Sequence, residues 1–155
     1  MPIEIERKFL LANEDWRQDV LRSNRIRQGY LGKIDKASVR IRVEGAKANI
    51  NVKSATLGMR RMEYEYAIPL DEAEEMLQQL CEQPQIDKTR YIVELAGHTW
   101  EIDEFYGDNE GLLVAEIELG SEDEAFEKPE WAGEEVTEDP RYYNVNLIHH
   151  PYNLW

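Results

Sequence analysis

The chain has 155 residues, enough for a domain with its own core, and no boundary rich in Pro, Gly or Ser divides it, so one domain over 1–155 is expected. Its 32 acidic and 18 basic residues give a formal net charge of −14, which disfavours nucleic-acid and anionic-membrane partners. No run approaches the roughly 20 apolar residues that span a bilayer, no signal-peptide core opens the chain, and the lone Cys81 excludes an internal disulfide; these features predict a cytoplasmic protein.

Most of the chain alternates apolar and polar residues with period two, which predicts β-strands. The first predicted elements are a strand over 2–10 and a short helix after Asn13 that buries Trp16 and Val20. Further strands are predicted at 25–33, 37–45, 47–54 and 60–69. Short Gly-containing links between several of these runs favour antiparallel hairpins.

The next predicted element is an amphipathic helix, because apolar residues recur at helical spacing between Ala73 and Cys81. Asp71 is its expected N-cap, Glu74 the capping-box partner three residues on, and Pro84 the stop. The last strands are predicted at 86–95, 97–105 and 112–119.

Two more helices are predicted towards the C-terminus. One follows Ser121, with Glu124 at the capping-box position, and the other starts at Asp139 and Pro140 and runs through Leu147. Eight antiparallel strands with few helices favour an α+β protein, and eight strands suffice to close a barrel around one small ligand. We therefore expect a closed eight-stranded antiparallel β-barrel with a few peripheral helices and a C-terminal helix.

Charged residues are ordered along the predicted strands, because those two positions apart share one face. The shared faces hold Glu4, Glu6 and Lys8; Arg40, Arg42 and Glu44; Arg61, Glu63 and Glu65; Lys88 and Arg90; Glu101 and Asp103; and Glu116 and Glu118. Like charges at this spacing, about 7 Å apart, repel unless a counter-charge joins them. Carboxylates suit Mg²⁺ or Mn²⁺, and clustered Arg and Lys suit phosphates. The residues alone leave open both a tunnel for a metal and a polyanion and an ordinary salt-bridged sheet.

The order of these charged strands is also the order of motifs in a known family. Glu4-Ile5-Glu6-Arg7-Lys8 is an E-x-E-x-K opening, and R-x-R, a strand ending in Lys53, R-x-E-x-E, K-x-R, an aspartate strand and a second E-x-E follow. The tail from Gly133 to Asn144 fits as well. Over its whole length the chain resembles the CYTH superfamily, the triphosphate tunnel metalloenzymes, and especially its short bacterial inorganic triphosphatases. The resemblance implies metal-dependent hydrolysis of a triphosphate, with inorganic tripolyphosphate first, inside a barrel tunnel.

The resemblance further implies roles for individual side chains. The expected ligands of Mg²⁺ or Mn²⁺ are Glu4, Glu6, Asp103, Glu116 and Glu118. The expected substrate-binding cations are Lys8, Arg40, Arg42, Lys53, Arg61, Lys88 and Arg90. Glu63 and Glu65 are expected to orient the arginines, and Lys8 with Tyr30 to form a general acid/base dyad.

Several alternatives stay open at this point. The chain could be a class IV-type adenylyl cyclase acting on ATP, a nucleoside or thiamine triphosphatase, or a module that binds polyphosphate or an organic phosphate without turnover. In each case the expected partner is a small polyanion, with no nucleic acid and no membrane, and a monomer and a homodimer are both compatible with the sequence. Asn51 stands where many relatives carry a hydroxyl residue, and its amide offers a similar hydrogen bond.

Overall fold

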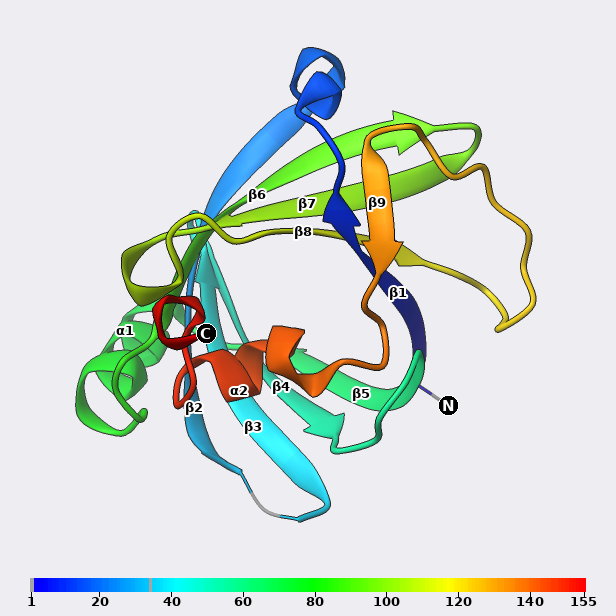
Figure 1. Ribbon diagram of the computed structural model, residues 1–155. Coiled ribbons are helices and arrows are strands. Elements are labelled where there is room, and N and C mark those ends of the chain that lie inside the picture. Colours follow the sequence, from blue (N-terminus) through cyan, green and yellow to red (C-terminus); the bar gives the residue numbers. More distant parts are fainter. Residues whose placement is uncertain (1, 34) are drawn as a thin grey trace.

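The computed structural model describes residues 2–33 and 35–155, and within them eight strands form a barrel (Figure 1). The strands are β1 (Ile3–Leu11), β2 (Arg22–Lys33), β3 (Ala37–Glu44), β4 (Lys47–Ser54), β5 (Arg60–Ala67), β6 (Ile86–Leu95), β7 (His98–Phe105) and β8 (Leu113–Glu118). Their order is β5-β4-β3-β2-β6-β7-β8-β1, every pair is antiparallel, and pairing of β1 with β5 closes the ring. The predicted closed eight-stranded antiparallel barrel is confirmed.

Strand β1 closes the barrel by changing its partner along its length. One edge pairs with β8, which places Glu6 opposite Glu118 and Lys8 opposite Glu116. On the other edge Ile3–Ile5 pairs with β5, and the end of β1 pairs with a ninth strand, β9 (Ala132–Glu135). Strand β9 was not predicted, because four residues containing one apolar side chain carry no period-two signal.

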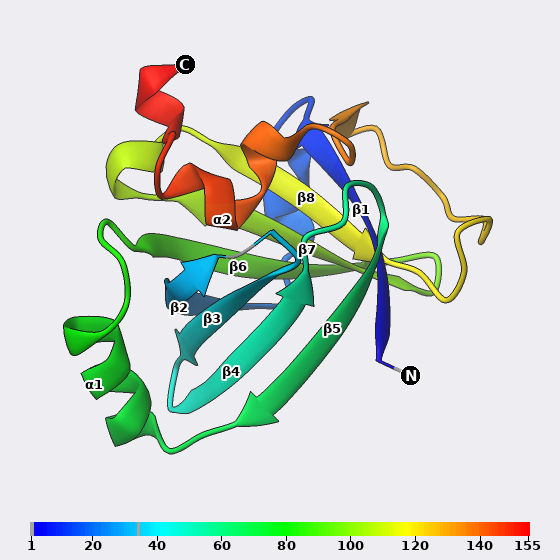
Figure 2. The ribbon, with the colours of Figure 1, turned by 90° about the horizontal axis from the view of Figure 1, so that it is seen from below.

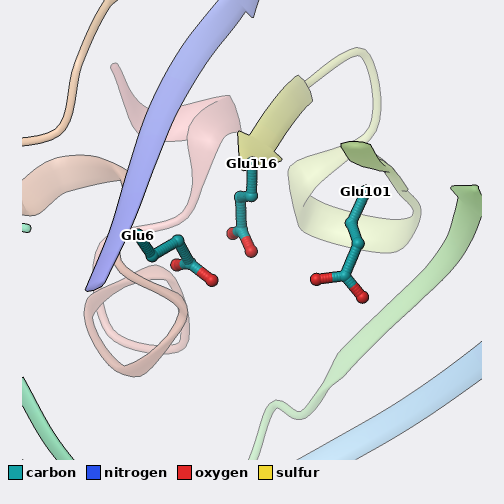
Figure 3. A group of neighbouring side chains, drawn as sticks. All are labelled: Glu6, Glu101 and Glu116. Carbon is teal, nitrogen blue, oxygen red and sulfur yellow. The ribbon is translucent and has the colours of Figure 1, made fainter. Parts of the chain in front are cut away.

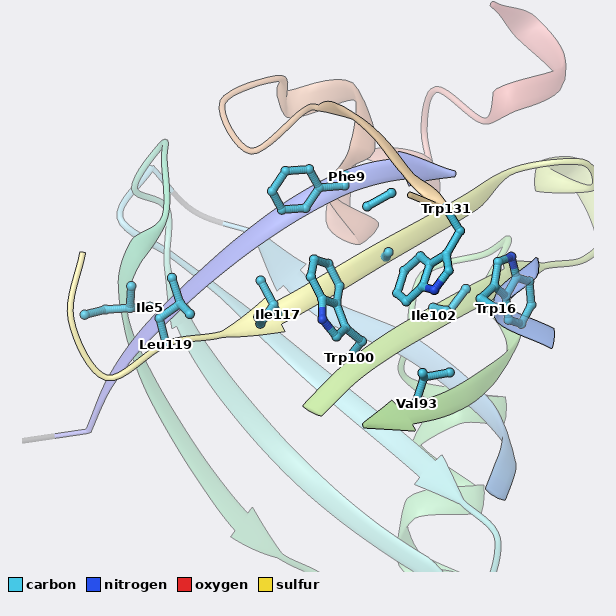
Figure 4. Packing of buried hydrophobic residues seen from close by; sticks show 11 residues of the cluster. Ile5, Phe9, Trp16, Val93, Trp100, Ile102, Ile117, Leu119 and Trp131 are labelled. Carbon is cyan, nitrogen blue, oxygen red and sulfur yellow. The ribbon is translucent and has the colours of Figure 1, made fainter. Parts of the chain in front are cut away.

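One hydrophobic core covers the outer face of β1, β7 and β8 (Figure 4). Trp100 lies at its centre, with ring centroids 5.6 Å from Phe9, 5.2 Å from Trp131 and 5.9 Å from Phe126. The short 3₁₀ helix η1 (Asp15–Asp19) adds the fully buried Trp16, which confirms the helix predicted after Asn13. These residues occupy the strand positions that alternate with the charged ones, so the apolar face is outside and the charged face inside.

A second outer core lies between β3, β4 and the helix α1 (Leu70–Gln79), whose buried Ala73 and Leu77 confirm the predicted amphipathic face. The predicted capping was wrong. The helix begins at Leu70 with Pro69 at the N-cap, no side chain caps it, and Glu74 instead forms an ion pair with Arg27 of β2. Two further short 3₁₀ helices are η2 (Gly107–Asn109) and η4 (Tyr152–Leu154). No helix of the described residues is long and apolar enough to cross a membrane.

The helix predicted after Ser121 is absent, and residues 124–129 have no regular secondary structure. Glu124 accepts a hydrogen bond from the Gly120 backbone at 2.7 Å and lies 2.5 Å from His98 Nε2. Its carboxylate therefore contacts Gly120 and His98 and does not cap a helix. The segment instead lays Phe126 over the outer core. Tertiary contacts of this kind outweigh a weak local helix signal.

The C-terminal segment crosses one end of the barrel (Figures 1 and 2). Asp139 caps η3 (Pro140–Tyr142) by accepting from the Arg141 backbone at 3.1 Å, as predicted. The single helix predicted through Leu147 was wrong, because Tyr143 is extended (φ −75°, ψ 129°) and separates η3 from α2 (Asn144–Leu147). Leu147, fully buried, packs with inward-facing strand residues such as Tyr30. The segment thus fills that end of the barrel.

Truncation of Trp100 is expected to show how much the outer core contributes to stability. Trp100→Ala should lower the free energy of unfolding by about 3–5 kcal/mol, because it leaves a cavity among three rings. Trp100→Phe should cost less, since Trp100 Nε1 is buried without a hydrogen-bond partner among the described residues and phenylalanine removes that group. Urea unfolding of both variants tests this, and equal losses would contradict it.

Candidate active site

The barrel encloses a polar cavity of about 260 Å³ that receives side chains from all eight of its strands. Its charged lining consists of Glu4, Glu6, Lys8, Arg40, Arg42, Glu44, Lys53, Arg61, Glu63, Glu65, Lys88, Arg90, Glu101, Glu116 and Glu118. These are seven cations and eight carboxylates, which nearly balance. Almost all of the net charge of −14 therefore lies outside the cavity.

The predicted site residues are brought together with one exception. All of them line the cavity except Asp103, which is fully buried behind the lining. Arg90 donates to both Asp103 oxygens, Nε to Oδ1 at 2.8 Å and Nη2 to Oδ2 at 2.9 Å, and Lys88 Nζ donates to Oδ2 at 2.8 Å. Burial opposes ionisation of Asp103, but Arg90 and then Lys88 outweigh it and lower the pKa of this carboxyl to about 2. In this structure Asp103 anchors two cations of the wall.

Arg42 and Lys88 are also tied to the C-terminal segment. Arg42 Nε donates to Gln28 Oε1 at 2.9 Å, and Gln28 Nε2 donates to Asn144 Oδ1 at 2.8 Å. Lys88 Nζ donates to the same Asn144 oxygen at 2.9 Å. Burial lowers the pKa of Lys88 to about 7, although Asp103 acts in the opposite direction. Neither Gln28 nor Asn144 was predicted, because an uncharged amide gives no charge-pattern signal.

The wall formed by β3, β4 and β5 presents donors without protein acceptors. Arg40 Nε, Asn51 Nδ2 and Arg61 Nε are buried and make no hydrogen bond among residues 2–33 and 35–155. Burial, then the neighbouring Arg40 and Arg90, lowers the pKa of Arg42 to about 10. Buried polar groups are normally hydrogen-bonded. Unsatisfied donors with mutually repelling cations indicate a wall suited to an anion.

Two lysines lie between carboxylates at the side of β1. Lys53 Nζ is 3.0 Å from Glu4 Oε1 and 3.1 Å from Glu63 Oε2. Lys8 Nζ is 2.6 Å from Glu116 Oε1. Burial alone would lower the pKa of Lys8, but Glu116 and Glu6 raise it, so Lys8 is a cation. Both lysines could exchange these carboxylates for phosphate oxygens if a metal ion took the carboxylates.

Three carboxylates, one each from β1, β7 and β8, point towards one another in the cavity (Figure 3). Glu6, Glu101 and Glu116 each offer an oxygen within 4.8 Å of the other two. Burial, then repulsion from Glu116, raises the pKa of Glu6 to about 8. Burial also raises the pKa of Glu101. A donor set made only of carboxylate oxygens suits a hard divalent cation, whose charge would relieve this repulsion, so the residues fit a metal site.

Glu101 of this group was not among the expected metal ligands, although it shares a strand face with Asp103. The pairing register places it directly opposite Glu116 of β8. Glu118, by contrast, is exposed and lies outside the group of three. Burial and then Glu4 raise the pKa of Glu118.

The structure does not join the predicted Lys8–Tyr30 dyad by a hydrogen bond. Both side chains line the cavity, but no hydrogen bond between them occurs among the described residues. Tyr143 instead faces the cations, with its ring centroid 5.9 Å from Lys8 Nζ and 5.0 Å from Arg61 Cζ. Its hydroxyl donates to Thr137 O at 2.8 Å. The dyad stays a prediction.

Known proteins of similar sequence and structure share this arrangement of the chain. The family pattern described as the CYTH domain matches residues 2–152. An inorganic triphosphatase of Acetivibrio thermocellus is 48% identical over 149 residues, which cover 96% of this chain and 95% of the relative. An inorganic triphosphatase of Nitrosomonas europaea is 41% identical over 148 residues, covering 93% and 95%. The crystal structure of the inorganic triphosphatase NE1496 superposes with a TM-score of 0.69 at 38% identity and covers 94% and 93% of the two chains.

Proposed function

We propose, since this chain belongs to the CYTH domain family, that it hydrolyses inorganic tripolyphosphate to pyrophosphate and orthophosphate in its barrel cavity. The observation that carries this proposal is the cavity itself, which is lined both by unsatisfied arginine donors and by a group of three carboxylates. The names of the two relatives, both inorganic triphosphatases aligned over nearly the whole chain, support the choice of substrate.

We further propose that Glu6, Glu101 and Glu116 hold Mg²⁺ or Mn²⁺, with Glu4 and Glu118 as additional candidates nearby. Asp103 is a weaker candidate, because both of its oxygens already accept hydrogen bonds from Lys88 or Arg90. When bound, a divalent ion neutralises phosphate charge and lowers the pKa of a coordinated water.

The remaining lining residues bind and orient the substrate. Arg40, Arg42 and Arg61 offer planar forks that match phosphate oxygens, and Lys8, Lys53, Lys88 and Arg90 complete the cationic wall. Glu63 keeps Lys53 in place, and Glu65 lines the cavity close to the same wall. Water adds to the terminal phosphorus as its bond to the bridging oxygen breaks, and the cations stabilise the charge that collects on that oxygen.

The proposal is tested by incubating purified protein with tripolyphosphate, ATP or thiamine triphosphate, each with Mg²⁺ or Mn²⁺. We expect tripolyphosphate to give one orthophosphate and one pyrophosphate per turnover, and no turnover once the metal is chelated. Cyclic AMP with pyrophosphate from ATP would instead identify an adenylyl cyclase. Binding of all three without turnover would identify a phosphate-binding module.

A further inference from the structure

The side-chain oxygen of Asn144 is linked to two cations of the cavity wall, directly to Lys88 and through Gln28 to Arg42. It is the first residue of α2, in the segment that fills one end of the barrel. Its Oδ1 accepts from Lys88 Nζ on β6 at 2.9 Å and from Gln28 Nε2 on β2 at 2.8 Å. A carbonyl oxygen has two lone pairs, so these two donors use its full capacity.

The orientations of both amides follow from their neighbours. Arg42 is a pure donor, so Gln28 must turn Oε1 towards it and present Nε2 to Asn144. Lys88 is likewise a donor only, so Asn144 must present its oxygen to both partners. The chain Arg42–Gln28–Asn144–Lys88 therefore has one self-consistent arrangement, and no other amide orientation satisfies it.

This arrangement links the C-terminal segment to the phosphate-binding wall. Leu147, one turn along α2, is fully buried in the inner core and fixes the helix. Gln28 is also fully buried, so bulk water does not compete with Asn144 as the acceptor for its Nε2. Asn144 itself lines the cavity next to the cations that it holds.

We infer that Asn144 is a positioning residue, which orients Lys88 directly and Arg42 through Gln28 for binding the triphosphate; this rests on the proposed function. Without its oxygen, Lys88 keeps Asp103 as partner and Gln28 loses the acceptor that fixes its side chain. Displacement of a substrate-binding group by about 1 Å can cost about 100-fold in rate. The effect should fall on substrate binding, because the wall contacts the ground state as well as the transition state.

The test compares Asn144→Ala with Asn146→Ala, a matched asparagine of the same short helix whose Nδ2 donates to Pro140 O at 2.8 Å. Asn144→Ala should raise the KM for tripolyphosphate by about 10-fold or more with a smaller change in kcat, and Asn146→Ala should leave both unchanged. Adding Gln28→Leu to Asn144→Ala should raise KM by a smaller factor than Gln28→Leu does in the wild type, because the asparagine reaches Arg42 through the glutamine. An unchanged KM in Asn144→Ala, an equal rise in Asn146→Ala, or an additive double variant would overturn the inference.

Failure of the proposed function would be visible separately. If the wild type does not turn over tripolyphosphate, the proposed reaction is wrong, and the same three variants are compared by calorimetric titration with tripolyphosphate in the absence of metal. Weaker binding by the variants that carry Asn144→Ala, with unchanged binding by Asn146→Ala, then supports the positioning role of Asn144. Equal binding by all of the variants and the wild type contradicts it.

Discussion

Glu6→Gln is expected to abolish most turnover of tripolyphosphate without loss of the fold, lowering kcat by about 10³-fold. Glu6 is one of three carboxylates whose oxygens lie within 4.8 Å of each other. Glutamine keeps the shape of the side chain but removes the charge that attracts a divalent ion. Because burial and Glu116 raise the pKa of Glu6 to about 8, ionised Glu6 is unfavourable in the metal-free fold, and a permanently neutral glutamine removes that cost. The melting temperature of the metal-free variant should therefore equal or exceed that of the wild type.

The measurements for Glu6→Gln are steady-state turnover and the rise in melting temperature on addition of Mn²⁺. A ligand that binds only the folded state raises its stability, so the wild type should show this rise and the variant should lose it. Glu104→Gln is the matched control, since Glu104 lies on the outer side of β7 and accepts from Tyr91 at 2.9 Å. Full metal-dependent turnover by Glu6→Gln would show that the metal lies elsewhere.

The barrel and its charged interior could be predicted because strand alternation is a local property with a fixed period. Glu4, Glu6 and Lys8 must share a face once β1 is extended, and the same rule places Arg40 with Arg42. A closed barrel in which the first and last of the eight strands are neighbours brings their two E-x-E pairs together, and the register shows that β1 and β8 are paired in this way.

The residues that were missed depend on relations between strands or between distant segments. Glu101 and Asp103 share a face of β7. Glu101 joins the carboxylate group because the strand register places it opposite Glu116, whereas Asp103 accepts a hydrogen bond from Arg90. Similarly, the break at Tyr143 follows from its hydrogen bond to Thr137 O and from the backbone of Gly58, which donates to its hydroxyl at 3.1 Å. Neither contact can be predicted from the spacing of apolar residues in the local sequence.

Arg40→Met is expected to stabilise the ligand-free protein while it weakens tripolyphosphate binding by about 10- to 100-fold. Arg40 is 8% exposed, and its Nε has no hydrogen-bond partner among the described residues. It also helps to lower the pKa of Arg42, so the two guanidinium groups repel each other. A buried charge without full compensation costs free energy, and replacing such groups with apolar ones of similar volume is often neutral or stabilising by about 1–4 kcal/mol. The triphosphate would supply the missing acceptors, which is why the cost is tolerated in the free protein.

Arg27→Met is the control for this opposite change in stability and binding. Arg27 is paired with Glu74 on the outside of the barrel, so its loss should lower stability by less than about 1 kcal/mol and leave binding unchanged. Thermal unfolding without ligand and calorimetric titration with tripolyphosphate measure the two quantities for both variants. A destabilised Arg40→Met protein with unaltered binding would mean that Arg40 is a structural group. Higher stability with weaker binding would show that Arg40 contributes to anion binding and not to the stability of the ligand-free fold. In that case the unsatisfied donors of β3, β4 and β5 reflect selection for binding at the expense of stability.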